Sequence, residues 1–286
     1  MTSSPVSFDI SRIGRWSEEF EHHVEAERTK AFAAATNDDN PLHTAGTIAP
    51  PGFASVPSIP PLFAAIEAFV PGEARSGSVH TGQDICLFRP IVPGMTLHSR
   101  AAVVGLSPAR SGTGVNLKTQ TRDVAGDLVN EGYSTLFLRG VTGAPAVGET
   151  PPDHRMPAEL RGDEPIASVA SAIAEDQTFR YAAASGDHSR IHLDADYARS
   201  LGFPGIIVHG LCTMAIASCA IVARACQGDS TRLRRLAVHF SRPVLPGQRI
   251  TTRIFAPPGP GGRTYRFTVL NPAGKAIIQD GLAEVS

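Results

Sequence analysis

The sequence predicts an α+β fold made of two tandem copies of one structural unit. Three observations support this prediction. Short motifs recur in the same order in the two halves of the 286-residue chain. Each half carries a helical pattern of apolar residues, followed by strand patterns that Gly and Pro turns separate. A stretch rich in Pro and Gly lies between the halves. A buried helix followed by an antiparallel sheet is an α+β arrangement.

The internal repeat is visible in three pairs of segments, each of which aligns without gaps. In the first pair, FAAATNDDNPLH and YAAASGDHSRIH share an Asp and a His at the same spacing. The second pair reads RPIVPG and RPVLPG, and each member of the third pair forms a turn between two strand-like runs. Three matches in the same order argue against chance. The paired segments are 32–43 with 181–192, 89–94 with 242–247, and 123–126 with 271–274.

These matches divide the chain into three predicted parts. Residues 1–140 form the N-terminal repeat, residues 141–165 form a linker, and residues 166–286 form the C-terminal repeat. Pro and Gly residues are spread along the linker, so we expect it to be stiff and long enough to cross one face of a domain.

Each repeat is predicted to contain the same elements in the same order. A short helix comes first, a polar loop with Asp and His follows, and an apolar helix precedes four strands. The apolar helix of the second repeat has little polar surface, which predicts its burial. The predicted helices are Glu27–Ala35, Ile59–Phe69, Asp176–Ala184 and Leu211–Gln227. The predicted strands, expected to form an antiparallel meander in each repeat, are Asp84–Phe88, Thr96–Gly105, Val115–Arg122, Tyr133–Arg139, Leu236–Phe240, Gln248–Phe255, Thr264–Leu270 and Lys275–Val285.

The composition excludes several classes of function. With 26 Lys+Arg against 27 Asp+Glu the formal net charge is −1, and no basic tract is present, so we expect no nucleic-acid partner. Four cysteines are too few for a disulfide framework, and Cys212, Cys219 and Cys226 recur as on one buried helix face. We find no signal peptide and no run approaching the ~20 apolar residues of a membrane span. We therefore expect a soluble, cytoplasmic protein.

The C-terminal repeat carries the most specific motif. Residues 181–192 read YAAASGDHSRIH, and residues 203–211 read FPGIIVHGL. This pattern resembles the MaoC-like dehydratases, which include the R-specific enoyl-CoA hydratases (hydratase 2). Their motif runs aromatic, small residues, Ser-Gly-Asp-x-Asn-Pro, an apolar residue and His. The resemblance implies the hot-dog fold, in which an antiparallel sheet wraps a long helix. Because it extends to both repeats, we expect a double hot-dog fold.

The resemblance also implies an acid–base site in the C-terminal repeat. Asp187 is expected to act as base on a water molecule, with His192 as its acid–base partner and the Gly210 amide as donor to the thioester oxygen. The chemistry agrees, because a carboxylate and an imidazole on one loop can converge on one water, and a helix N-terminus favours a developing oxyanion. Which of the two groups protonates the α-carbon stays open. The residues expected to bind substrate are Tyr181, Gly186, Ser189, Val208 and His209, with a structural role beside the loop as the alternative for His209.

The second repeat departs from the family motif at one place. Ser189 and Arg190 stand where the family has Asn-Pro. Ser189 can hydrogen-bond but is shorter than Asn, so we expect the water or Asp187 to be oriented differently from the family pattern.

The first repeat keeps a possible secondary site in Asp38, Asn40 and His43. If Pro51 stands opposite Gly210 of the second repeat, this copy has no N–H to donate there, because proline lacks one. The first repeat is also shorter and lacks a counterpart of residues 194–203. We therefore expect it to be degenerate as a site and to hold the acyl chain.

The function implied is reversible hydration of trans-2-enoyl thioesters, or dehydration of (R)-3-hydroxyacyl thioesters, a lyase reaction of fatty acid metabolism. No cofactor is expected, because the thioester acidifies the α-proton and the protein supplies positioning and electrostatics. We favour CoA over acyl carrier protein as the carrier. Two fused copies already make the pseudo-dimer that single hot dogs form, and a homodimer of such chains stays open.

Three alternatives remain beside this function. His188 and His192 have the i,i+4 spacing of a metal pair, but no third ligand has a fitting position, so we predict no metal site. A hot-dog thioesterase would hydrolyse the thioester, and such sites usually rely on a carboxylate without the Asp-x4-His pair. A non-catalytic acyl-thioester-binding double hot dog is favoured by Ser189 and Arg190.

Overall fold

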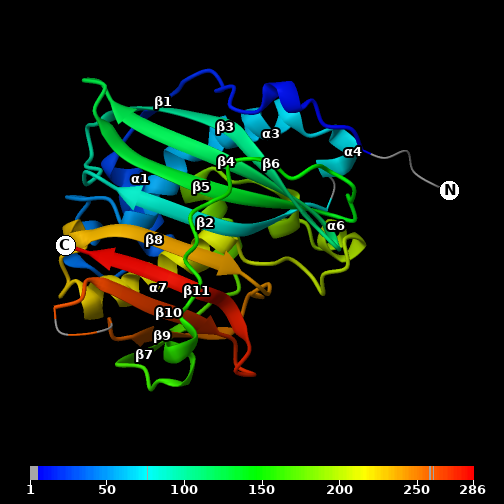
Figure 1. Cartoon of the computed structure of the whole chain (residues 1–286). Coiled ribbons are helices and arrows are strands. Elements are labelled where there is room, and N and C mark those ends of the chain that lie inside the picture. Colours follow the sequence, from blue (N-terminus) through cyan, green and yellow to red (C-terminus); the bar gives the residue numbers. More distant parts are fainter. Residues whose placement is uncertain (1–5, 76, 258, 260) are drawn as a thin grey trace.

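The computed structural model describes residues 6–75, 77–257, 259 and 261–286 of the chain. Its strands form one twisted antiparallel sheet, which lies in front of the helices in Figure 1. The strand order is β1-β3-β4-β5-β2-β8-β11-β10-β9-β7, and the short β6 pairs with β3 outside this path. The five strands on one side of the β2–β8 contact come from residues 20–139, and the five on the other side come from residues 167–285. The predicted α+β class is confirmed.

The observed elements agree with the predicted ones to within a few residues at each end, some longer, some shorter and some identical. The strands are β1 Phe20–His23, β2 Val79–Leu87, β3 Thr96–Ala109, β4 Gly112–Asp123, β5 Leu128–Arg139, β6 Val147–Gly148, β7 Ala167–Ala172, β8 Leu233–Phe240, β9 Arg249–Phe255, β10 Thr264–Leu270 and β11 Ala276–Val285. The helices are α1 Ala26–Ala35, α2 Pro41–Thr44, α3 Ile59–Phe69, α4 Gly72–Arg75, α5 Gln177–Ser185, α6 Ala195–Ser200 and α7 Gly210–Ala225, with 3-10 helices η1 Ile10–Arg12, η2 Pro51–Ser58, η3 Ala158–Gly162, η4 Arg190–His192 and η5 Ser230–Arg232.

Each repeat wraps its half of the sheet around one apolar helix. In the second repeat this helix is α7, which is apolar on nearly every face and therefore buried along most of its length. In the first repeat η2 and α3 form one continuous helical segment, Pro51–Phe69, which is apolar and long enough to cross a membrane by length and composition. This corrects the expectation that no such run exists. Because 61% of the segment is buried inside the fold, we interpret it as the core helix of the first repeat.

The two repeats make matching hydrogen bonds at their turns and pair symmetrically at their contact. Asp123 Oδ1 accepts hydrogen bonds from two backbone N–H groups of its turn, and Asn271 Oδ1 does the same in the second repeat. The β2–β8 ladder pairs Asp84 with Ala237, which are related by the same offset as segments 89–94 and 242–247. The ladder is therefore centred on the pseudo-twofold axis. The Arg235 guanidinium spans this axis and donates two hydrogen bonds to Asp84, at 2.9 and 2.8 Å.

The predicted meander is correct for three strands of each repeat and wrong for the fourth. Strands β3, β4 and β5 follow one another in the sheet, as do β9, β10 and β11. However, β2 pairs with β5 and β8 pairs with β11, so the first strand of each set lies beside the last one instead of beside the second. The edge strands β1 and β7 were not predicted. Their sequences, FEHH and ASVASA, contain too few large apolar residues to give a strand pattern.

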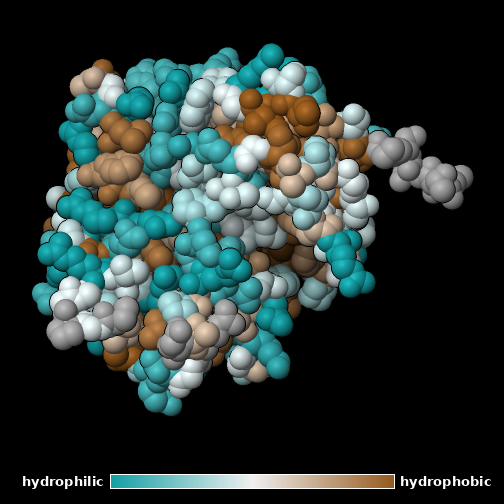
Figure 2. All heavy atoms as spheres, viewed as in Figure 1, coloured by the Kyte–Doolittle hydropathy of each residue, from teal (hydrophilic) through white to brown (hydrophobic). Residues whose placement is uncertain are grey.

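The segment between the repeats crosses the outer face of the sheet (Figure 1). It is held there by Asp280, whose carbonyl accepts a 2.8 Å hydrogen bond from His154 Nδ1 and whose Oδ1 accepts one from the Met156 amide. This outer face mixes hydrophilic and hydrophobic residues in Figure 2, as is usual for an antiparallel sheet with one face toward solvent. The bounds 1–140, 141–165 and 166–286 stay a prediction.

Candidate active site

A cavity of about 610 Å³ lies between the two repeats. The second repeat lines it with the loop that connects α5 to α7, and the first repeat lines it with α3 and the start of β2. Residues from the two repeats therefore share one space. The predicted site residues that line it are Asp187, Ser189, His192, Val208, His209 and Gly210.

The carboxylate of Asp187 is held in place by its own loop. Helix α5 ends at Gly186, whose φ of 86° is left-handed and suits glycine, and the chain then turns into the cavity. Asp187 Oδ1 accepts hydrogen bonds from the Ser189 amide at 3.1 Å and from the Ser189 hydroxyl at 2.6 Å. Burial raises the pKa of Asp187, but His209, His192 and the Ser189 hydrogen bonds together outweigh it and hold that pKa below its ordinary value. Asp187 is therefore ionised at neutral pH, with Oδ2 available as an acceptor.

The ring of His192 presents a lone pair to the cavity. Its Nδ1 lies 2.8 Å from the carbonyl oxygen of Ile207, so the hydrogen is on Nδ1 and Nε2 is the acceptor. Burial lowers the pKa of His192, and the charge of Asp187 offsets only part of this effect, so the ring is neutral near pH 7. One carboxylate oxygen of Asp187 and one ring nitrogen each of His192 and His209 lie within 4.8 Å of one another. A water molecule can bridge polar groups at such a separation.

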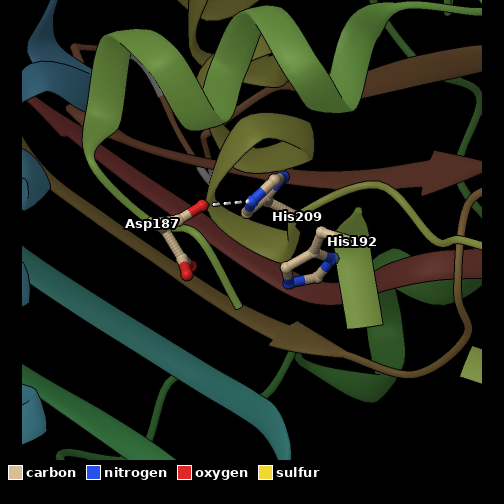
Figure 3. A group of neighbouring side chains, drawn as sticks. All are labelled: Asp187, His192 and His209. Carbon is tan, nitrogen blue, oxygen red and sulfur yellow. Dashed lines mark hydrogen bonds between the residues drawn. The ribbon is translucent and has the colours of Figure 1, made fainter. Parts of the chain in front are cut away.

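His209 supports the loop from behind, which favours the structural alternative named for it above. Its Nε2 donates a 3.0 Å hydrogen bond to the backbone carbonyl of Asp187, drawn as the dashed line in Figure 3. Its ring stacks on His192 with 3.7 Å between centroids, and burial lowers its pKa to about 3. Stacked imidazoles direct their in-plane lone pairs side by side, whereas a metal ion requires lone pairs that converge. The group formed by Asp187, His192 and His209 therefore does not suit a metal in this arrangement.

The N-terminus of α7 opens into the same cavity. Helix α7 begins at Gly210, and its N-cap residue His209 provides no side-chain hydrogen bond to the first turn. The first N–H groups of a helix lack internal acceptors, and they carry the positive end of the helix dipole. The Gly210 amide is thus placed to donate to an oxygen in the cavity. A Cβ at this position would stand 3.2 Å from the ring of Phe240, so glycine also lets that ring approach closely.

The corresponding groups of the first repeat are closed against each other. Asp38 Oδ2 lies 2.7 Å from His43 Nδ1, and the Ser230 hydroxyl lies 2.8 Å from His43 Nε2. All three residues are buried. The cavity beside Ser230 measures only about 30 Å³, which is enough for one water molecule and no acyl group. Asn40 is used structurally, since it caps α2 and donates to the carbonyl of Gly228.

Pro51 occupies the position in the first repeat that is equivalent to Gly210 in the second. The Val208 amide donates to the Val244 carbonyl, and the Ala49 amide donates to the Ile91 carbonyl in the same way, at 2.8 and 2.9 Å. Pro51 therefore begins the core helix of the first repeat where Gly210 begins that of the second. Since proline has no N–H, this end of the first repeat has no equivalent donor.

Two predicted substrate-binding residues do not line the cavity. Tyr181 is fully buried, and its ring packs against Phe32 and against His209, so it supports the site from the core. Gly186 serves the left-handed turn described above, and its Cβ position would face Arg28. The expectation that these residues contact a ligand is therefore corrected.

Several residues of the cavity were missed by the sequence analysis. They include His80 on β2 and the apolar side chains Ile59, Leu62, Phe63 and Ile66 of the α3 segment. No local pattern could have identified them, because they reach the site only through the pairing of β2 with β8.

Comparisons with known proteins find similarity in both halves of the chain. Residues 153–256 match the MaoC-like domain, and residues 11–131 match the dehydratase domain region of FAS1-like proteins. The chain is 27% identical over 184 residues to the peroxisomal enoyl-CoA hydratase 2 of Arabidopsis thaliana, covering 62% of this chain and 59% of that one. It is 35% identical over 165 residues to 3-hydroxyacyl-thioester dehydratase Y of Mycobacterium tuberculosis, covering 56% of this chain and 55% of that one.

The chain thus covers less than two thirds of the length of these two relatives. Among solved structures, a MaoC-like dehydratase from Phytophthora capsici has a TM-score of 0.86 at 24% identity, with 97% of this chain and 98% of that one covered. This likeness shows that the fold extends over both repeats. A solved protein of Mycobacterium tuberculosis described as having a double hot-dog fold has a TM-score of 0.62 at 16% identity, with 95% of each chain covered, so the expected double hot-dog fold is confirmed.

Proposed function

Because residues 153–256 match the MaoC-like domain, we propose that this chain is a hydro-lyase that acts on acyl thioesters. It adds water reversibly to trans-2-enoyl thioesters and removes water from (R)-3-hydroxyacyl thioesters. The observation that carries the proposal is the arrangement of three groups around one cavity: an ionised carboxylate, a neutral imidazole and an uncapped helix N-terminus.

The reaction follows from the states of these groups. The water lies between Asp187 Oδ2 and His192 Nε2, both of which are acceptors, so its oxygen lone pair is free to attack C3 of the enoyl group. One of the two acceptors takes a proton from the water as the hydroxyl adds to C3, and the group thus protonated delivers this proton to C2, so that it returns to its starting state. Negative charge that develops on the thioester oxygen is stabilised by the Gly210 amide and by the dipole of α7. No step requires a cofactor.

The first repeat serves the reaction as a binding wall. The apolar side chains of the α3 segment line the same cavity as Asp187 and His192, which supports their use in holding the acyl chain. The repeat's own Asp38 and His43 are closed by their mutual hydrogen bond and by Ser230, so we assign them no part in turnover.

One assay tests the proposal against its competitors. The purified chain is incubated with crotonyl-CoA, and the enoyl absorbance and free thiol are followed together. We expect the absorbance to fall without release of thiol. Release of thiol would indicate a thioesterase, and neither change would indicate a non-catalytic binder. Longer and branched enoyl-CoA substrates are run in parallel, because a short substrate underfills a cavity of about 610 Å³.

The carrier is tested with the same reaction. We expect crotonyl-CoA to be a better substrate than crotonyl acyl carrier protein, judged by kcat/KM. The variant Asp187→Asn is the matched control in each arm, because it keeps the size of the side chain and removes the base.

A further inference from the structure

His80 places an imidazole from the first repeat in the wall of the cavity that holds Asp187 and His192. Its ring packs edge-on against Phe240, with 5.3 Å between centroids. Phe240 in turn covers Gly210, at the N-terminus of α7. The ring of Phe240 therefore lies between His80 and the Gly210 amide, which is proposed to bind the thioester oxygen.

The orientation of His80 is fixed by the backbone. Its Nε2 lies 2.8 Å from the Gly82 carbonyl oxygen. A carbonyl can only accept, so the hydrogen is on Nε2 and Nδ1 is the acceptor of the ring. The β2–β5 register shifts between His80 and Gly82, and such bulges redirect a side chain. Burial lowers the pKa of His80 and outweighs the opposing effects of the Gly82 carbonyl, the charge of Asp187 and a hydrogen bond with the Gln83 side chain, so the ring is neutral at pH 7.

The residue equivalent to His80 in the second repeat shows whether packing requires a histidine at this position. The offset of 153 residues that relates segments 89–94 and 242–247 places Leu233 opposite His80 and Ser230 opposite Gly77. Leu233 is 2% exposed and lines the cavity of about 30 Å³ beside Ser230, whereas His80 and Gly77 line the open one. Burying an imidazole costs solvation that a leucine does not lose. Because leucine fills this position in the second repeat, packing alone does not require a histidine. We therefore interpret His80 as a residue that acts in the cavity.

The substrate carries a hydrogen-bond donor close to its thioester group. An acyl thioester of CoA or acyl carrier protein carries an amide N–H two methylene groups beyond its sulfur. A buried N–H without an acceptor is costly, and a neutral imidazole nitrogen is a suitable acceptor. We propose that His80 Nδ1 accepts a hydrogen bond from this first amide of the pantetheine arm and so determines the specificity for amide-bearing thioesters. This inference rests on the proposed function.

The experiment compares two substrates that differ in this one group. One is the crotonyl thioester of N-acetylcysteamine, and the other is its oxygen isostere, S-(2-acetoxyethyl) thiocrotonate, in which oxygen replaces the N–H. We expect the wild-type kcat/KM to be about tenfold higher for the amide. In His80→Leu this ratio should fall to about one, and in His80→Gln, which keeps an acceptor oxygen, part of it should return. His23→Leu, on the exposed strand β1, controls for a general effect of replacing histidine by leucine.

The outcomes separate this inference from the function on which it rests. If wild type hydrates both substrates and the ratio is the same in His80→Leu, or is already one in wild type, the role of His80 is wrong and the proposed function stands. If wild type hydrates neither these substrates nor crotonyl-CoA, both fall. Circular dichroism checks each variant, and His80→Met carries the same comparison if His80→Leu does not fold.

Discussion

Asp38 and His43 hydrogen-bond directly to each other, with 2.7 Å between Oδ2 and Nδ1, inside a part of the protein that solvent does not reach. In the second repeat the equivalent imidazole donates instead to the Ile207 carbonyl, and the equivalent carboxylate is held by Ser189. One pair is thus closed and the other stays open to a cavity, although the two derive from the same motif.

This contrast predicts different consequences for the same substitution in the two repeats. Asp187→Asn should lower kcat for crotonyl-CoA by roughly 10²–10⁴-fold, because it removes a general base. Asp38→Asn should leave kcat nearly unchanged and lower the free energy of unfolding by about 1–3 kcal/mol, because it disturbs a buried hydrogen bond. Enoyl absorbance and urea titrations measure the two effects. Loss of turnover in Asp38→Asn with normal turnover in Asp187→Asn would show that the wrong repeat was assigned.

The Gly210 amide can be removed without removing the helix that it begins. Proline is well tolerated in the first turn of a helix, and Pro51 already stands at this place in the first repeat. We expect Gly210→Pro to lower kcat by roughly 10²–10³-fold through loss of the oxyanion donor, with unchanged far-UV circular dichroism. Gly210→Ala is the control, since its Cβ makes the same approach to Phe240 but its N–H remains. Equal losses in the two variants would point to crowding by Phe240 instead.

Acid should destabilise the protein through its buried histidines. Burial lowers the pKa of His209 to about 3, well below the ~6.5 of an unfolded histidine. Between these values the unfolded chain binds the proton and the folded chain does not. Stability is therefore fully present above pH 6.5 and is lost as the pH falls, by up to about 1.4 kcal/mol per pH unit for this group. Urea titrations from pH 7 to pH 4 measure the slope.

The variant His209→Asn isolates the contribution of this side chain, because it cannot titrate. We expect its free energy of unfolding to fall less steeply with acid than that of wild type. Parallel slopes would assign the acid sensitivity to other histidines, such as the half-buried His22, whose pKa is lowered to about 4 by burial.

The ion pair between Arg235 and Asp84 joins the two repeats at the centre of the sheet. Asp84 is 3% exposed, so removal of Arg235 leaves a buried carboxylate without its partner. We expect Arg235→Met to cost roughly 3 kcal/mol, and the double variant Asp84→Leu with Arg235→Met to lose less than the sum of the single variants. A thermodynamic cycle from urea titrations measures the coupling. Additive losses would mean that the pair contributes no interaction of its own.

Local patterns in the sequence were sufficient for the repeat, the core helices and the strands that follow them. The pairing of segments 32–43 and 181–192 also located both Asp–His pairs. The sequence could not show that one pair is closed, because Ser230, which completes the closure, is distant from His43 in the chain. It could not show His80 in the cavity for the same reason, since that contact depends on the order of strands. Tyr181 was assigned to substrate binding because it belongs to the motif, but a motif includes residues needed for packing as well as residues needed for chemistry.

The continuous pairing of β2 with β8 favours the encoding of both repeats in one polypeptide. If the gene were split between the repeats, each product would expose a central strand edge prone to aggregation. Fusion instead guarantees that every open Asp187–His192 pair comes with one wall from the other copy, in fixed one-to-one stoichiometry. One repeat can therefore lose its own acid–base groups while the whole chain keeps all the residues that form the cavity.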